Sequence, residues 1–326
     1  MSTNTATAVA SPNIALIKYW GNKNQTLRIP VTGSISFNLD SLFTKTQIRF
    51  NPEILSDILL INGIKSTGSE LDRVTSFLNI IRNFSGSHLN AQIQSENNFP
   101  IGTGIASSAS AFAALAFAAS SALGMDLSEK ELSSLARRGS GSACRSIPDG
   151  FVEWYPGEND SDSYATSIAP ANHWDLVDLV AVVNNEHKKV GSTAGHELAN
   201  TSPLQDARVA DTKRRLDIVR SAIKFRDFQA MAETIEQDSN MMHAVMMTSK
   251  PSLMYWECHS ISIMKSVVSW RSSGLPVCYT MDAGPNVHVI TTKDYAPKIH
   301  QRLSSLKGIK QIYESGVGGK ARLING

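Results

Sequence analysis

The sequence is poor in cysteine, in net charge and in long apolar runs, and each shortage narrows the class of protein. Its three cysteines, Cys144, Cys258 and Cys278, have neither metal-ligand spacing nor the even number of a disulfide framework. Reduced thiols of a cytoplasmic protein are therefore expected. The 31 basic and 29 acidic side chains nearly cancel, so nothing electrostatic favours nucleic acid or an acidic membrane as a partner. Small molecules that need a local cation are the expected ligands.

The first residues and the longest uncharged run both argue against targeting or membrane segments. MSTNTATAVA at the start lacks the basic residues and the apolar stretch of a signal peptide. The run IASSASAFAALAFAASSALG, residues 105–124, has the length of a membrane helix but consists mainly of alanine and serine. We expect it to be a buried helix that packs tightly on a sheet.

The residues that are present predict a mixed fold. Apolar residues make up 42% of the chain, which is enough for buried cores. The first half alternates strand-like runs with helical periodicity at 68–86, a Ser128/Glu131 capping box and a buried strand at 176–184. Residues 204–248 read as helical, then 251–274 as a helix and 275–292 as two strands. Without regular strand–helix alternation this order predicts an α+β fold, divided into domains 1–185 and 186–326.

The first candidate site is the start of the alanine-rich helix, PIGTGIASSASAFAAL, which begins at residue 100. Glycines let backbone N–H groups turn toward an anion, the helix N-terminus adds a positive dipole end, and serine hydroxyls can bind phosphate. The stretch matches neither common nucleotide-loop motif, so a structural role stays open. The candidate nucleotide-binding residues are Pro100, Gly102, Gly104, Ala106, Ser107 and Ser108, with Ser107 as a weak candidate for Mg²⁺.

Three further stretches place charge where a fold alone does not need it. RRGSGSACRS puts Arg145 after a glycine- and serine-rich segment, where its guanidinium can grip a carboxylate; a helix-breaking loop is the alternative. YTMDAGPNVHV puts Asp282 before a sharp turn, where an aspartate is often only a turn residue. NIALIKYWGNKNQ puts Lys18 in an apolar run, where an unpaired ammonium is costly.

Four motifs in one order resemble a known family. NIALIKYWG, NFPIGTGIASSAS, LARRGSGSACRSIPDGFVEW and MDAGPN, spread over residues 13–286, are together similar to mevalonate diphosphate decarboxylases of the GHMP kinase superfamily. The resemblance implies a GHMP kinase fold, a two-domain α/β sandwich with a cleft between the domains. It also implies ATP with Mg²⁺, a phosphorylated mevalonate as the small-molecule substrate, and a homodimer.

The same resemblance implies roles for single residues. Asp282 would contact the 3-hydroxyl as the catalytic acid, and Arg145 would hold the substrate carboxylate. Lys18 would supply positive charge nearby, and Asn13 would help to order the nucleotide loop. The implied substrate-binding residues are Tyr19, Trp20, Gly21, Asn22, Ser140, Gly141, Ser142 and Thr193, although the aromatic pair Tyr19–Trp20 is also typical of a plain core.

Two departures from the family pattern concern the phosphate tail of the substrate. Asn22 stands where many members have a lysine, and Thr193 aligns with an arginine. Each lost cation removes a charge-assisted hydrogen bond worth roughly 1.5–3 kcal/mol. The sequence therefore predicts 5-phosphomevalonate as the substrate and isopentenyl phosphate as the product.

Three alternatives stay open on sequence alone. If Lys23, Lys188 or His196 replaces the missing cations, the protein is a mevalonate diphosphate decarboxylase that makes isopentenyl diphosphate. A mevalonate 3-kinase would phosphorylate and stop. A non-catalytic binding protein would be expected to have a damaged glycine loop or to lack Asp282, and this sequence has both features intact.

Overall fold

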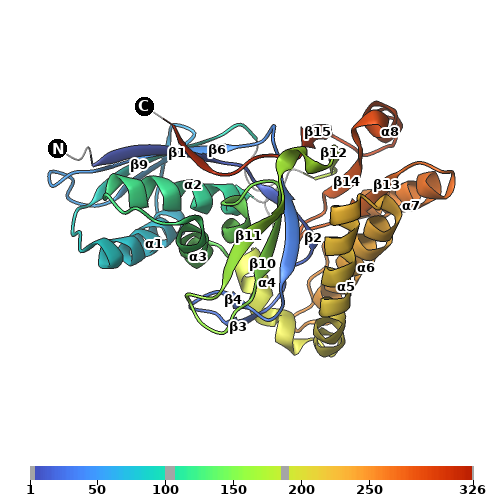
Figure 1. The fold of residues 1–326 in the computed structure, drawn as a ribbon, viewed down its shortest axis with the longest axis horizontal. Coiled ribbons are helices and arrows are strands. Elements are labelled where there is room, and N and C mark those ends of the chain that lie inside the picture. The colour runs from blue at the N-terminus through green and yellow to red at the C-terminus, as the bar shows by residue number, and fades with distance from the viewer. Residues whose placement is uncertain (1–3, 100–106, 185–190, 325–326) are drawn as a thin grey trace.

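The computed structural model describes residues 4–99, 107–184 and 191–324, and its first layer is a six-stranded sheet covered by three helices (Figure 1). The strand order is β16-β1-β6-β9-β7-β8. The strands are β1 (Thr5–Ala10), β6 (Thr44–Phe50), β7 (Ile58–Ile61), β8 (Ile64–Ser66), β9 (Ala91–Asn97) and β16 (Arg322–Ile324), and the helices are α1 (Ser69–Ser85), α2 (Ser107–Ala122) and α3 (Glu129–Gly139). Helix α2 packs on β1 and β6, and all its alanines except Ala111 are buried, which confirms the prediction of a buried small-residue helix.

A four-stranded antiparallel sheet forms the middle of the molecule, in the order β11-β10-β5-β2. Its strands are β2 (Asn13–Ile17), β5 (Ser34–Asn38), β10 (Phe151–Tyr155) and β11 (Tyr164–Ala169). A short hairpin of β3 (Asn22–Asn24) and β4 (Ile29–Pro30) follows β2. The long helices α5 (Gln205–Phe225) and α6 (Phe228–Thr248) lie side by side and pack on β2.

The third sheet has the order β13-β14-β12-β15 and is packed against two helices. Its strands are β12 (Leu176–Val182), β13 (Val277–Thr280), β14 (Val287–Thr292) and β15 (Gln311–Gly316), and the helices are α7 (Cys258–Ser272) and α8 (Ala296–Ser304). The predicted buried strand at β12 is confirmed, since every one of its residues is buried. Although β12 precedes residue 185, it pairs with β14 and β15. The division at residue 185 stays a prediction.

One hydrophobic core joins the middle sheet to the helices and strands of the second half. It contains Phe37 of β5, Val180 of β12, Val219 of α5, Ile235 of α6 and Ile290 of β14. Because this core is continuous, β2 and the end of β13 are held in one packed unit. Residues more than two hundred positions apart in the sequence can therefore meet at the ends of these strands.

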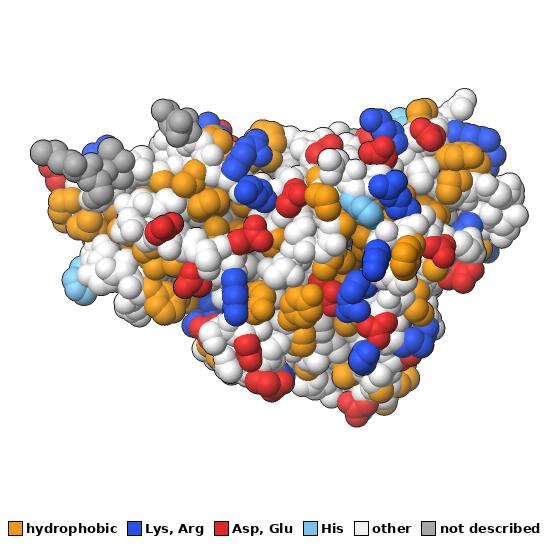
Figure 2. All heavy atoms as spheres, viewed as in Figure 1, with side chains coloured by type: hydrophobic (Ala, Val, Ile, Leu, Met, Phe, Trp, Pro, Cys, Tyr) orange, Lys and Arg blue, Asp and Glu red, His pale blue; other side chains and the backbone are white. Residues whose placement is uncertain are grey.

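Local signals in the sequence account for several element boundaries. Helix α1 buries Phe77, Leu78 and Ile81 as its periodicity predicts, and α3 begins at the predicted capping box of Ser128 and Glu131. Helix α7 starts at residue 258 rather than at 251, because the Glu257 side chain caps it. On the face shown in Figure 2, basic and acidic side chains are interspersed. No helix among the described residues is long and apolar enough to cross a membrane.

Candidate active site

Lys18 and Asp282 form an ion pair across 264 positions of sequence. Lys18 directly follows β2, and Asp282 lies just after β13. The lysine Nζ is 2.6 Å from Asp282 Oδ1, with side-chain exposures of 1% and 26%. The sequence predicts a substrate anion near Lys18, and the structure adds a protein carboxylate as the partner of this lysine. Because Asp282 is partly exposed, its carboxylate remains within reach of a ligand.

Arg145 is a buried cation that neutral oxygen atoms hold in place. Its Nε donates to Asn13 Oδ1 (3.2 Å) and Ser36 Oγ (3.1 Å), and its Nη1 donates to Ser34 Oγ (2.6 Å). The residue is only 3% exposed, and burial lowers the pKa of its guanidinium. Among the described residues its hydrogen-bond acceptors are all uncharged. A buried cation of this kind favours the arrival of an anionic ligand.

Ser34 and Ser36 were missed by the sequence analysis. They lie on β5, whose sequence SISFN alternates polar and apolar residues, and both are fully buried. A strand that is polar on one face and buried on both needs an internal partner for its hydroxyls. The alternation of polar and apolar residues in SISFN was therefore the signal that could have revealed Ser34 and Ser36. Their partner is Arg145, which donates to both hydroxyls.

A chain of hydroxyls joins the two candidate phosphate-binding segments. Ser108 lies in the first turn of α2, and its Oγ is 3.2 Å from Ser140 Oγ, which is 3.5 Å from Ser142 Oγ. Residues Gly141–Ser146 form the 3-10 helix η1 directly after α3. Asn13 Nδ2 donates to the Ser142 carbonyl (3.1 Å) and to Ser146 Oγ (2.8 Å). Asn13 thus ties β2 to η1 while its Oδ1 accepts from Arg145.

The glycines on either side of Ser140 leave space for neighbouring aromatic rings. A Cβ at Gly141 would lie 2.6 Å from the Tyr19 ring, and one at Gly139 would collide with Phe112. Neither glycine has a positive φ, whereas Gly21, with φ 95°, does. Close approach of η1 to Tyr19 therefore requires glycine at position 141.

The segment after Lys18 is held in an uncharged network. Tyr19 Oη donates to Asn22 Oδ1 (2.5 Å), and Asn22 Nδ2 donates to Gln25 Oε1 (2.8 Å). His196 Nδ1 accepts from the Gly21 amide (3.0 Å), and its ring stacks on Tyr19 at 4.0 Å between centroids. Burial, with the positive charge of Arg28, lowers the pKa of His196 to about 3. Asn22 and His196 are therefore both neutral near pH 7.

Several predicted residues remain without a test of their roles. Pro100, Gly102, Gly104 and Ala106 lie outside the described residues; Ser107 begins α2, and Thr193 lies in α4 (Ser192–Leu198). Trp20 is 2% exposed and packs in a core with Met242, Met246 and Leu253. That packing matches the alternative of a plain core residue, so its substrate role stays a prediction.

The arrangement brings together the groups that phosphoryl transfer and loss of a carboxylate require. Asp282 is a carboxylate within reach of a ligand, Lys18 and Arg145 are buried cations, and Ser108, Ser140 and Ser142 supply hydroxyl groups. Among the described residues, no group of three or more His, Cys, Asp and Glu side chains could hold a metal ion.

Comparisons with known proteins match both halves of the chain to family models. Residues 10–165 match the model of the diphosphomevalonate decarboxylase-like N-terminal domain, and residues 178–322 match that of the mevalonate 5-diphosphate decarboxylase C-terminal domain. A diphosphomevalonate decarboxylase of Ganoderma lucidum is 37% identical, over 92% of this chain and 81% of its own. A phosphomevalonate decarboxylase of Haloferax volcanii is 31% identical over 98% of both chains.

A solved structure is similar along the whole chain. It is described as MDDEF in complex with MVAPP, AMPPCP and magnesium, and it is 37% identical with a TM-score of 0.93. The match covers 99% of both chains. The similarity therefore includes both halves of the chain and the segments that contain Lys18, Arg145 and Asp282.

Proposed function

The chain belongs to the diphosphomevalonate decarboxylase family, and we propose that it is an ATP-dependent decarboxylase that acts on 5-phosphomevalonate. The products are isopentenyl phosphate, ADP, phosphate and CO2, which places the reaction in isoprenoid synthesis by the mevalonate pathway. The relatives named diphosphomevalonate and phosphomevalonate decarboxylase support the reaction class. The fold is that of the GHMP kinase superfamily, and the implied cytoplasmic homodimer stays a prediction.

The first stage is phosphoryl transfer to the 3-hydroxyl of the substrate. A bond forms between the hydroxyl oxygen and the γ-phosphorus of ATP while the bond to ADP breaks, and Asp282 orients the hydroxyl and takes its proton. Lys18 fixes the Asp282 carboxylate through their 2.6 Å contact. Magnesium that arrives with ATP would supply charge that neutralises the phosphates, and Ser107 and Ser108 at the start of α2 would bind these phosphates.

The second stage breaks the bond between C3 and the new phosphate. As the phosphate leaves with its electron pair, the electrons of the bond between C2 and the carboxylate carbon form the double bond between C2 and C3, and CO2 departs. Arg145 holds the carboxylate in position for this step. Its buried guanidinium, bonded to Asn13, Ser34 and Ser36, is fixed before the substrate arrives.

The uncharged state of Asn22 is the single observation that carries the choice of a monophosphate tail. Asn22 is 5% exposed, and both ends of its amide are already bonded to Tyr19 and Gln25. Of the three cations that could compensate, Lys23 pairs with Glu158 at 2.8 Å, and His196 is neutral. Lys188 lies outside the described residues. A tail with one phosphate group needs fewer cations than a tail with two.

Arg28 provides the cation that a single phosphate group needs. It lies in the turn before β4, and its Nε donates to the carbonyl of Arg138 (3.1 Å), two residues before Ser140. Its positive charge is the second-largest cause, after burial, of the lowered pKa of His196. Its backbone has φ 51°, an unfavourable conformation for a residue other than glycine, and such strain gathers at functional positions. Arg28 would thus bind the phosphate beside Ser140 and Ser142.

The decisive experiment compares three substrates with Mg-ATP: mevalonate, 5-phosphomevalonate and 5-diphosphomevalonate. ADP and CO2 are measured in parallel for each. The proposal expects equal amounts of both products and the highest kcat/KM with 5-phosphomevalonate. A higher kcat/KM with the diphosphate would overturn it in favour of the alternative that the relative from Ganoderma lucidum represents. ADP without CO2 would instead support a mevalonate 3-kinase.

A further inference from the structure

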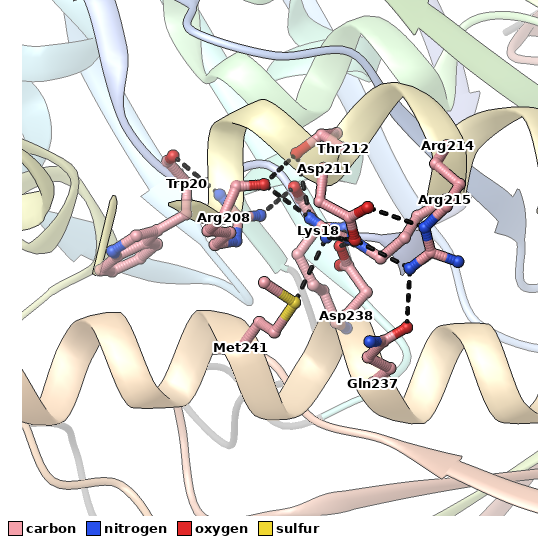
Figure 3. Close-up of polar contacts among 10 residues, drawn as sticks. All are labelled: Lys18, Trp20, Arg208, Asp211, Thr212, Arg214, Arg215, Gln237, Asp238 and Met241. Atoms are coloured by element: carbon pink, nitrogen blue, oxygen red, sulfur yellow. Dashed lines mark hydrogen bonds and ion pairs between the residues drawn. The ribbon is translucent and has the colours of Figure 1, made fainter. Parts of the chain in front are cut away.

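The backbone at Lys18 is held by buried side chains from α5 and α6 (Figure 3). The Lys18 amide donates to Asp238 Oδ2 at 2.6 Å. Arg208 Nη2 donates to the Lys18 carbonyl at 2.7 Å, and its Nη1 lies 3.4 Å from the Trp20 carbonyl. Lys18 comes just after the last residue of β2, so these side chains supply hydrogen bonds to its backbone where the pairing of the strand ends.

A second set of contacts fixes Asp238 itself. Arg215 Nε donates to Asp238 Oδ1 at 2.8 Å, and both side chains are 0% exposed. Arg215 Nη2 also donates to the Arg208 carbonyl (2.9 Å) and to Thr212 Oγ1 (3.0 Å). Residues 208, 212 and 215 recur at helical spacing on the face of α5 that points toward α6 and Lys18. The carboxylate therefore has little freedom to move.

Stability alone gives a weak reason for such a cluster. Two charges lose their hydration when they are buried, and apolar replacements of buried ion pairs are often neutral or stabilising. Arg208 is also fully buried, and its Nε has no hydrogen-bond partner among the described residues. Asp238 and Arg208 converge on the backbone that carries Lys18, and Arg215 holds Asp238 in place.

We infer that Asp238, Arg215 and Arg208 are positioning residues that fix the backbone of Lys18 and thereby hold its Nζ against Asp282. Lys18 is thus anchored at both ends, by Asp238 at its amide and by Asp282 at its ammonium. The inference rests on the roles proposed above for Lys18 and Asp282. It extends the site to side chains that touch neither the substrate nor ATP.

Asp238→Asn is the main test, and Asp57→Asn is its matched control. Asp57 is also a buried carboxylate with an arginine partner, Arg82, and it also accepts a backbone amide, that of Ala91. It lies directly before β7 of the first sheet, whereas Lys18 follows β2 of the middle sheet. Both substitutions remove one buried negative charge from a comparable network, so their costs to folding are similar.

The expected result is a selective loss of turnover. A catalytic group displaced by about 1 Å can lose on the order of a hundredfold in rate. We expect Asp238→Asn to lower kcat by about that factor with KM for ATP unchanged, and Asp57→Asn to leave kcat unchanged at a similar melting temperature. Acylation of Lys18 by an amine reagent, mapped by mass spectrometry, should be faster in Asp238→Asn than in the wild type or in Asp57→Asn.

A second variant keeps the inference testable if Asp238→Asn does not fold. Arg208→Met removes the donors to the Lys18 and Trp20 carbonyls but also relieves a buried cation, so its cost to folding should be smaller. It should reproduce the loss of kcat and the faster acylation of Lys18. A folded Asp238→Asn or Arg208→Met protein with normal kcat and normal Lys18 acylation would overturn the inference.

The two readouts separate this inference from the proposed function. Turnover is measured with whichever phosphorylated mevalonate the wild type prefers. A preference for the diphosphate would therefore contradict only the proposed choice of substrate. If the wild type turned over none of them, the proposed function would fail. The acylation rates would still show whether Asp238 and Arg208 hold Lys18 in place.

Discussion

The substitution Asn22→Lys should shift the substrate preference from 5-phosphomevalonate toward 5-diphosphomevalonate. In the structure Asn22 is almost fully buried beside Tyr19 and opposite Pro30 of β4. Asn22→Lys would break the hydrogen bonds to Tyr19 and Gln25 and place an ammonium next to Tyr19. If the tail of the substrate lies here, the new cation meets a second phosphate group when one is present.

The size of the effect follows from the bond that the substitution would create. A charge-assisted hydrogen bond contributes roughly 1.5–3 kcal/mol, which corresponds to about tenfold to a hundredfold in affinity. Loss of the hydrogen bonds to Tyr19 and Gln25 weakens the binding of both substrates alike, so it cancels in the ratio of their kcat/KM values. We therefore expect the kcat/KM ratio of diphosphate to monophosphate to rise by about tenfold to a hundredfold.

The assay is ADP release with each substrate under saturating Mg-ATP, with two controls. Methionine is similar in length to lysine, so Asn22→Met breaks the same hydrogen bonds without adding charge. Asn24→Lys adds the charge at an exposed position of the same strand. Equal ratios for Asn22→Lys and Asn22→Met would refute the reasoning, because the cation would then have no role in reading the tail.

Two further predictions concern Arg28 and the pH dependence of folding. Arg28→Gln should raise KM for 5-phosphomevalonate by about tenfold or more without changing KM for ATP, and steady-state kinetics with an unchanged substrate KM would contradict the assigned role. Burial lowers the pKa of His196 to about 3, so the unfolded chain takes up this proton first, near its ordinary value of 6.5. The resulting stability is present above pH 6.5 and is lost as the pH falls toward 3, by about 2 kcal/mol between pH 7 and pH 5. Between pH 7 and pH 5, the free energy of unfolding measured in urea should fall by about 2 kcal/mol more in the wild type than in His196→Met. An equal fall in both proteins would show that His196 takes no part.

The sequence predicted the elements whose signals are local. The periodicity of α1, the capping box of α3 and the apolar run of β12 each depend on residues a few positions apart. The resemblance to a family added the residues that the structure brings together around Lys18, Arg145 and Asp282. These motifs lie far apart along the chain, so spacing alone could not have joined them.

The partners of the site residues could not be predicted in the same way. Lys18 meets Asp238 across 220 positions and Asp282 across 264, and nothing in helical or strand periodicity pairs such residues. Arg208 and Arg215 look like ordinary polar positions of a solvated helix until the packing of α5 on β2 buries them. The glycine at 141 likewise reads as a flexible position, and only the nearness of Tyr19 gives its actual reason.

Strand β16 has a consequence for folding during synthesis on the ribosome. It pairs with β1, although more than three hundred positions separate the two strands along the chain. Until β16 emerges from the exit tunnel, β1 is an open edge that can pair with another nascent chain. The first half of the protein should therefore depend on chaperones until β16 has been synthesised. For the same reason, a fragment that stops before β16 should aggregate when it is expressed alone.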